Sequence, residues 1–123
     1  MSISSLILIL LSVVLSATSQ LLLKAGMSAP TVQASLEGGL AVQGLAIATS
    51  PLVFLGLCCF GLSAFTWLGV LARIQVSQAY PFVAMGIVMT AVGGYFIFGE
   101  ALTGLRIIGI VIVVVGVVII GAS

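Results

Sequence analysis

Five polar side chains form a line along the first apolar segment of the chain. They recur at intervals of three or four residues and are Ser12, Ser16, Ser19, Gln20 and Lys24. Such intervals place side chains on one face of a helix. Hydroxyl and amide groups hydrogen-bond to sugars and phosphates, and a lysine ammonium pairs with a phosphate. This line, called the polar stripe below, predicts a binding surface made by Ser16, Ser19, Gln20 and Lys24.

The polar stripe also has a purely structural interpretation. Serine and glutamine side chains often hydrogen-bond between neighbouring helices in a membrane, at roughly 0.6–2 kcal/mol per contact. Lys24 stands near the end of its segment, so its ammonium can instead reach the lipid headgroups by snorkelling. The two interpretations are compatible with each other.

The remaining reactive side chains exclude most enzyme chemistry. The chain has no histidine and only two acidic residues, Glu37 and Glu100, which lie far apart in the sequence. Its two cysteines, Cys58 and Cys59, are neighbours within an apolar run, where thiols behave as small hydrophobes. A nucleophile–histidine pair, a carboxylate dyad, a metal site and a phosphate-binding Gly-rich loop are therefore not expected. We predict a protein that is not an enzyme and needs no cofactor.

The composition indicates that helices in a lipid bilayer carry these residues. Of the 123 residues, 63% are hydrophobic and only five are formally charged. Four apolar runs have the length of about 20 residues that crosses a ~30 Å hydrocarbon core. The sequence predicts one all-α integral membrane domain, residues 1–123, whose four transmembrane helices form a bundle. Their expected bounds are about 3–27, 48–72, 76–98 and 102–121. The residues before the first run include no basic one, unlike a signal peptide, so we expect that helix to be retained.

The segment 31–46 lies between the first two runs and has a mixed pattern. Val32, Leu36 and Leu40 recur every four residues with polar residues between them, which predicts a short helix at the membrane interface. Gly38-Gly39 equally permits a loop that only extends the second span.

Two aromatic residues are candidate walls of a binding cavity. Trp67 lies about one and a half turns before Arg73, which favours a cavity wall over an anchor in the headgroup region. Tyr80 precedes Pro81 near the start of the third run, where a proline weakens the helical hydrogen bonds beside a polar patch. The alternative is that Tyr80 belongs to the interfacial aromatic belt and Pro81 is a first-turn proline.

The last run predicts contacts with a second subunit. Gly109 and Gly116 are seven residues apart among β-branched side chains, a spacing typical of a helix-packing seam. Four short helices enclose little volume, so we expect a dimer. Lys24 and Arg106 are expected at one membrane face and Arg73 at the other. So small a charge bias fixes orientation weakly, and both an antiparallel homodimer and a heterodimer with a related four-helix subunit stay open.

Three local patterns resemble the four-helix, EamA-like members of the drug/metabolite transporter superfamily. The run from Gly99 to Gly109, followed by Gly116-Val117, is similar to the Gly-Glu-x-Leu turn and glycine-spaced last helix that close those proteins. Ser77-Gln78-Ala79-Tyr80-Pro81 resembles the start of their third helix. The stripe from Leu15 to Lys24 looks most like the small flippase subunits that move aminoarabinose-phosphoundecaprenol across the bacterial inner membrane.

One departure from the small multidrug resistance branch bears on function. Those transporters carry a proton-exchanging glutamate in the first helix, and the resemblance puts Ser16 at that position. Ala-Tyr-Pro in place of Ala-Tyr-Ala points the same way. The resemblance therefore implies a flippase, or a flippase subunit, for a polyprenyl-phosphate-linked sugar or similar anionic lipid. Alternatives are a small-molecule exporter coupled in another way, through Glu100 for instance, and a membrane scaffold subunit that transports nothing.

A flippase must lower the cost of moving an anionic phosphate through hydrocarbon, which is several kcal/mol or more. Ser16, Ser19 and Gln20 would hydrogen-bond the sugar or phosphate. Lys24 would contact the phosphate, with Arg73 or Arg106 as a second cation near an interface. The Glu100 and Arg106 side chains also have a simpler interpretation, a solvated pair at the membrane surface. No nucleic acid partner is expected.

Overall fold

The computed structural model describes residues 2–123, and within them the chain is helical without a strand. Four helical segments are long and apolar enough to cross a membrane, so the predicted all-α membrane fold is confirmed. The elements are α1 (Ile3–Met27), α2 (Pro30–Ser35), α3 (Leu40–Ala48), α4 (Pro51–Leu71), α5 (Val76–Ala79), the 3-10 helix η1 (Tyr80–Val83), α6 (Ala84–Phe98) and α7 (Gly104–Ala122).

Local sequence explains where these helices begin and end. The Ser2 hydroxyl accepts from the Ser5 N–H, and the Thr103 hydroxyl accepts from the Arg106 N–H, so both residues cap a following helix. Pro51 opens α4 at a position where a missing N–H costs nothing. Gly99 ends α6 with a φ of 67°, a left-handed conformation that favours glycine.

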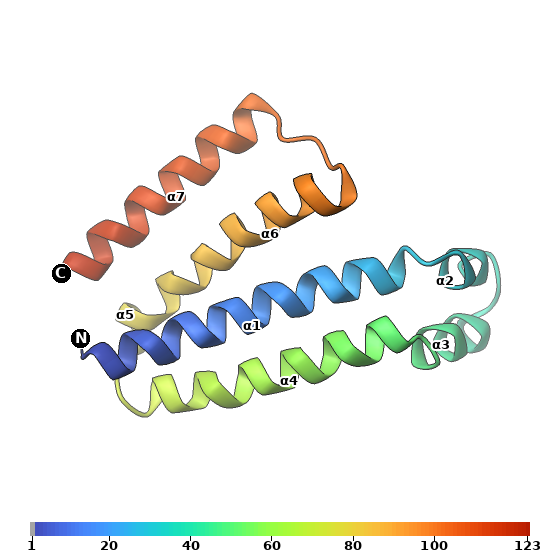
Figure 1. Ribbon diagram of the computed structural model, residues 1–123, viewed down its shortest axis with the longest axis horizontal. Coiled ribbons are helices and arrows are strands. Elements are labelled where there is room, and N and C mark those ends of the chain that lie inside the picture. Colours follow the sequence, from blue (N-terminus) through green and yellow to red (C-terminus); the bar gives the residue numbers. More distant parts are fainter. Residues whose placement is uncertain (1) are drawn as a thin grey trace.

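The helix α1 is the centre of the bundle. It packs along α4, which runs antiparallel to it, and along α6, which runs parallel to it (Figure 1). The last helix, α7, rests on α6 and η1, while α4 and α6 make few contacts with each other. As a result α1 lies between α4 and the third span, and both pack on it.

Small residues let α1 and α4 approach closely. A Cβ atom on Gly26 would lie 2.8 Å from the Val53 backbone nitrogen, and one on Gly56 would lie 2.8 Å from Leu23 Cγ. Close backbone approach at small residues is the usual basis of helix association in membranes, where lipid offers no hydrophobic driving force. These two glycines therefore set the distance between α1 and α4.

A small apolar cluster joins α1 to α4 and to the start of the third span. Ile9, Val13, Val70 and Ala79 are buried together there. At the other end of α6, Gly93 receives the Leu21 side chain of α1. The third span is thus held to α1 at both ends.

The third span is broken at the proline that the sequence singled out. α5 ends at Ala79, and residues Tyr80–Val83 form a 3-10 turn before α6 begins. Because Pro81 has no N–H, it cannot donate the helical hydrogen bond at this point. The 3-10 turn that carries Tyr80 lies against α1.

The segment between the first two spans is not the single helix predicted for 31–46. It consists of α2 and α3, separated by Leu36–Gly39, and the second span begins at Pro51 instead of residue 48. Gln33 Nε2 donates to the Met27 carbonyl and so joins α2 to the end of α1. Gln43 Nε2 donates to the Leu36 carbonyl and so stabilises the turn between α2 and α3. Figure 1 shows this pair beyond the ends of α1 and α4. Its position at a membrane interface stays a prediction.

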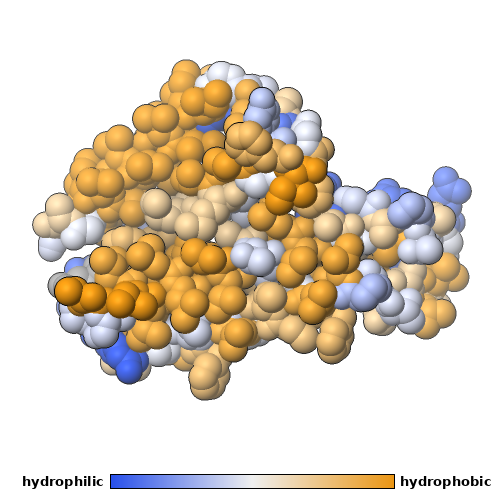
Figure 2. Space-filling model, viewed as in Figure 1, coloured by the Kyte–Doolittle hydropathy of each residue, from blue (hydrophilic) through white to orange (hydrophobic). Residues whose placement is uncertain are grey.

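The outer surface matches a multi-pass membrane protein. In Figure 2 apolar side chains cover the long helices, and hydrophilic ones gather at the ends of the bundle and over α2 and α3. Exposed side chains such as Phe65 on α4 and Leu105 on α7, at 74% and 83%, would be unfavourable in water and are favourable in lipid.

Candidate functional site

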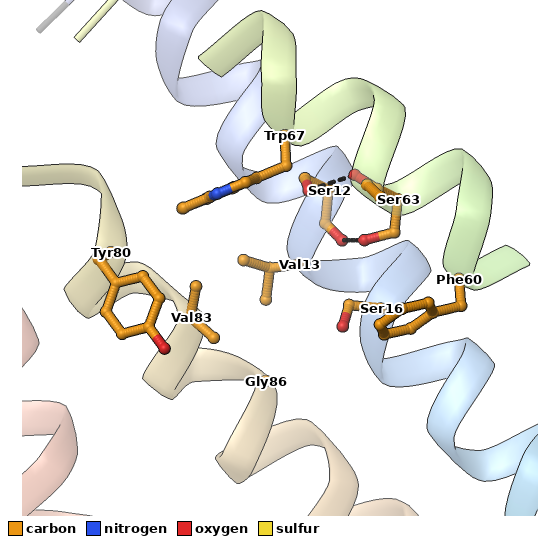
Figure 3. A pocket seen from close by; sticks show the side chains of 10 residues that line it. Ser12, Val13, Ser16, Phe60, Ser63, Trp67, Tyr80, Val83 and Gly86 are labelled. Atoms are coloured by element: carbon orange, nitrogen blue, oxygen red, sulfur yellow. Dashed lines mark hydrogen bonds between the residues drawn. The ribbon is translucent and has the colours of Figure 1, made fainter. Parts of the chain in front are cut away.

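A cavity of about 280 Å³ lies halfway along α1 and α4. We call it the central cavity. α1, α4, η1 and the start of α6 all contribute side chains to it (Figure 3). The lining consists of Ser12, Val13, Ser16, Phe60, Ser63, Ala64, Trp67, Tyr80, Val83 and Gly86. Within residues 2–123, α4 and α6 make few contacts with each other and no α7 residue lines the cavity, so the side between α4 and α6 is left open.

Two of the lining serines join α1 to α4. Ser12 Oγ donates to the Ser63 carbonyl at 3.0 Å, and Ser63 Oγ donates to the Ser12 carbonyl at 2.9 Å. Both residues are buried, so each hydroxyl is satisfied away from water. This reciprocal pair is the helix-packing use of serine that the sequence left open.

Three other polar side chains are available to a ligand. The Ser16 hydroxyl, the Trp67 indole N–H and the Tyr80 hydroxyl donate no hydrogen bond within residues 2–123. Figure 3 shows Trp67 and Tyr80 on opposite sides of the cavity and the Ser16 hydroxyl beside the Phe60 ring. The cavity thus combines aromatic surfaces with a few free donors, the usual composition of a small-ligand site.

The polar stripe is divided between two neighbouring faces of α1. Ser19 is completely buried, and its hydroxyl donates to the Ser16 carbonyl at 2.6 Å, so it does not line the cavity. Gln20 and Lys24 follow Ser16 by one and two turns, and both are exposed. They extend the line from the cavity toward the end of α1, with Lys24 about 12 Å beyond Ser16 along the helix.

Six lining residues outside the polar stripe were not predicted as site residues. They come from α1, α4, η1 and α6 and are Val13, Phe60, Ser63, Ala64, Val83 and Gly86. Ser63 lies one helical turn before Trp67, which is the one signal that pointed to this face of α4. Phe60, Val83 and Gly86 are residue types that membrane helices carry on every side, so nothing in the sequence distinguishes them.

The predicted ionic residues lie outside the central cavity, near the ends of the bundle. Arg73 borders a hollow at the end where α1 begins, and its Nη1 donates to the Gly69 carbonyl at 2.7 Å. Glu100 and Arg106 lie at the opposite end, where both line a cavity of about 340 Å³ between α6 and α7. Arg106 Nη1 donates to the Ala101 carbonyl at 3.0 Å.

The two glycines assigned to dimer packing have no close neighbour in the chain. A Cβ atom on Gly109 or Gly116 would meet nothing within 4 Å. Gly109 lines the cavity between α6 and α7, while Gly116 lies further along α7. The space beside both glycines leaves the dimer prediction untested.

The central cavity is uncharged, and this decides which kind of ligand it suits. Among residues 2–123 no acidic or basic side chain lines it, and Ser16 occupies the middle of α1 where an acid would be needed to exchange a proton. Aromatic rings and hydroxyls instead suit an uncharged polar group such as a sugar, through ring stacking and hydrogen bonds. The arrangement suits the binding and positioning of a ligand, and its lining residues include no nucleophile–base pair.

Comparisons with known proteins agree with the resemblance in the motifs. The chain is 35% identical over 74 residues to a probable 4-amino-4-deoxy-L-arabinose-phosphoundecaprenol flippase subunit ArnE of Pseudomonas aeruginosa strain UCBPP-PA14, covering 60% of this chain and 64% of the relative. It is 36% identical over 69 residues to the protein of the same name in Klebsiella pneumoniae, covering 56% and 62%. A third such protein, in Hamiltonella defensa, is 35% identical over 72 residues, covering 57% and 65%.

No known family model and no solved structure matches this chain. The chain spans a little under two thirds of the length of the relatives that it matches. Over that part, this four-span membrane protein is similar to proteins named as aminoarabinose-phosphoundecaprenol flippase subunits, which confirms the resemblance read from its motifs.

Proposed function

We propose that this chain is a subunit of a flippase for a polyprenyl-phosphate-linked sugar in the bacterial inner membrane. The observation that carries the proposal is the central cavity, which is aromatic, hydroxylated and uncharged and lies halfway along α1 and α4. The names of the relatives give the substrate class. The relatives, however, are matched over only part of their length.

The proposed path uses the open side of the bundle. A prenyl chain stays in lipid while its sugar enters the central cavity between α4 and the third span. The sugar stacks on Trp67 and Tyr80 and hydrogen-bonds to Ser16. Its passage then avoids the cost, several kcal/mol, of placing unpaired polar groups in hydrocarbon.

The phosphate is proposed to follow the outer part of the polar stripe. Gln20 and Lys24 extend from the cavity to one end of α1 and offer hydrogen bonds and a positive charge. Arg106 lies at that same end, and Arg73 lies at the other. A cation at each membrane face would hold the phosphate before and after it crosses. Ser19 takes part only by fixing the backbone at Ser16.

A second four-helix subunit is proposed to complete the path. One copy leaves the cavity open between α4 and α6, and the exposed face of α7 with Gly116 offers a surface for close packing. The partner is a second copy of this chain or a related subunit. The proposed dimer is consistent with the word subunit in the names of the relatives.

Reconstituted vesicles test the function. A labelled polyprenyl-phosphate sugar is placed in the outer leaflet, and its transfer is followed by protection from a reagent that cannot cross the membrane. Trp67→Ala should slow transfer about threefold to tenfold, the loss of one aromatic contact of roughly 0.5–1.5 kcal/mol. Phe65→Ala is the matched control, because Phe65 lies on the same helix and is 74% exposed.

The same vesicles separate the proposal from its alternatives. Uptake of a soluble cation driven by a proton gradient, without transfer of the lipid, would favour an exporter coupled through Glu100. No transfer by either this chain alone or the chain with its partner subunit would favour a scaffold. Equal transfer by the Trp67 and Phe65 variants would refute the assignment of the central cavity.

A further inference from the structure

The cavity between α6 and α7 is amphiphilic, and the path proposed above uses only one of its lining residues, Arg106. It has a volume of about 340 Å³ and lies near the end of α6, on the side of the bundle where α1 also ends (Figure 1). Glu100 and Arg106 line it and are both exposed, and Ile87, Ala91 and Val113 are among its apolar walls. A polar, charged end above an apolar slot has the shape and polarity of a bound lipid.

The Glu100 carboxylate has a defined position in this cavity, called its seat below. The Glu100 N–H donates to the Gly94 carbonyl at 3.1 Å, which turns the side chain back over the last turn of α6. The carboxylate lies directly over Gly94, where a Cβ atom would collide with its Oε1 and where the three nearest atoms all belong to Glu100. The carbonyls at the end of α6 also point to this side, so the seat favours a positive charge.

Arg106 supplies the opposite charge from α7. One nitrogen, Nη1, is fixed by the Ala101 carbonyl, and the guanidinium keeps further N–H donors for a phosphate. Within residues 2–123, Glu100 and Arg106 form no ion pair with each other, so neither neutralises the other. Two separate charges of opposite sign thus border one cavity.

We infer that this cavity is a headgroup site for an amphiphile that carries an ammonium group close to a phosphate. The ammonium pairs with Glu100, the phosphate pairs with Arg106, and the first part of the hydrocarbon chain lies between α6 and α7. The inference rests on the proposed function for one source of this chemistry, an amino-sugar phosphopolyprenol. The other source is a zwitterionic phospholipid, phosphatidylethanolamine.

Binding to the full chain in lipid nanodiscs tests the inference. The probes are 4-amino-4-deoxy-L-arabinose-phosphoundecaprenol, the same lipid with its amine formylated, phosphatidylethanolamine and phosphatidylglycerol. We expect the protein to prefer the free amine over the formylated lipid by about tenfold, the effect of one hydrogen bond between charged groups. Glu100→Gln should abolish this preference. Arg106→Gln should weaken both sugar lipids alike and leave the preference intact.

A positioning variant separates the seat of the carboxylate from its charge. Gly94→Ala keeps every charge and forces the Glu100 carboxylate to move, so it should reduce the preference for the amine as Glu100→Gln does. Gly61→Ala is the control, because a Cβ atom there meets nothing within 4 Å, and it should leave the preference unchanged.

The outcomes distinguish this inference from the proposed function. A preference for the amine that survives both Glu100→Gln and Gly94→Ala would overturn the inference, even if lipid transfer by the central cavity is intact. A third outcome is that the protein binds neither sugar lipid but binds phosphatidylethanolamine more tightly than phosphatidylglycerol, and that Glu100→Gln removes this difference. This outcome would support the headgroup site and refute the sugar-lipid flippase. Equal binding of all four lipids would refute the headgroup site.

Discussion

The contact between Gly26 and α4 gives a sharp prediction about stability. In Gly26→Ala the new Cβ would lie 2.7 Å from Val53 Cγ2 and 2.8 Å from the Val53 backbone nitrogen. Because a backbone atom cannot move aside by rotating a bond, α1 and α4 must separate locally. Overpacking of this kind costs roughly 1–3 kcal/mol. Alanine also raises helix propensity by up to about 1 kcal/mol, a gain that any glycine in a helix shares.

Gly61→Ala removes that gain from the comparison. Gly61 lies on α4 with open space beside it, so its substitution should be neutral or slightly stabilising. We expect Gly26→Ala to be about 2 kcal/mol less stable than Gly61→Ala. The measurement is reversible unfolding in mixed micelles, followed by helical circular dichroism and by Trp67 fluorescence.

A double variant tests the stated cause. Val53→Ala removes the Cγ2 contact but leaves the backbone nitrogen in place, so it should not restore the stability lost in Gly26→Ala. Full recovery would mean that the side chain alone sets the helix spacing. Equal stability of the Gly26 and Gly61 variants would refute the close packing of α1 on α4.

Three further predictions concern hydrogen bonds, backbone and the cavity. Ser12→Ala and Ser63→Ala should each lower the free energy of unfolding in micelles by about 1 kcal/mol. A double-mutant cycle should give a coupling energy well below that, because each hydroxyl donates to a backbone carbonyl that both variants keep. Gly99→Ala should destabilise by about 1 kcal/mol through its φ of 67°, and an equal melting temperature to the unaltered chain would contradict this. Ser16→Glu should impair transfer of a sugar lipid and create pH-dependent binding of a lipophilic cation, measured by calorimetry at two pH values, and unchanged transfer would argue against sugar binding at this point.

The membrane fold followed from the sequence because its cause is local. Four runs of apolar residues have the length of the hydrocarbon core, and a backbone in lipid must satisfy its hydrogen bonds within a helix. Pro81 predicted a weak point in the third span, where the structure has a 3-10 turn. Segment 31–46 was harder, since glycines and an apolar period favour different structures, and it forms two short helices.

The composition of the site depended on tertiary packing. Helical spacing placed Ser12, Ser16 and Ser19 in one stripe, yet Ser12 faces Ser63, Ser16 faces the cavity and Ser19 is buried in α1. A turn of 3.6 residues spreads such a stripe over more than one face, and the sequence does not say which helix covers which face. Only the packing of α4 on α1 showed that Ser63 pairs with Ser12.

The sequence alone determined that this is a four-span membrane protein and that it lacks an acid at the centre of its first helix. Both follow from residue types, since hydrocarbon tolerates few charges and a missing carboxylate cannot be replaced by folding. Only the tertiary structure decided that α1 is flanked by α4 and α6, that Trp67 faces Tyr80 across one cavity, and that Glu100 sits over Gly94 beside another. These depend on distances between segments far apart in the chain, which close packing at glycines sets.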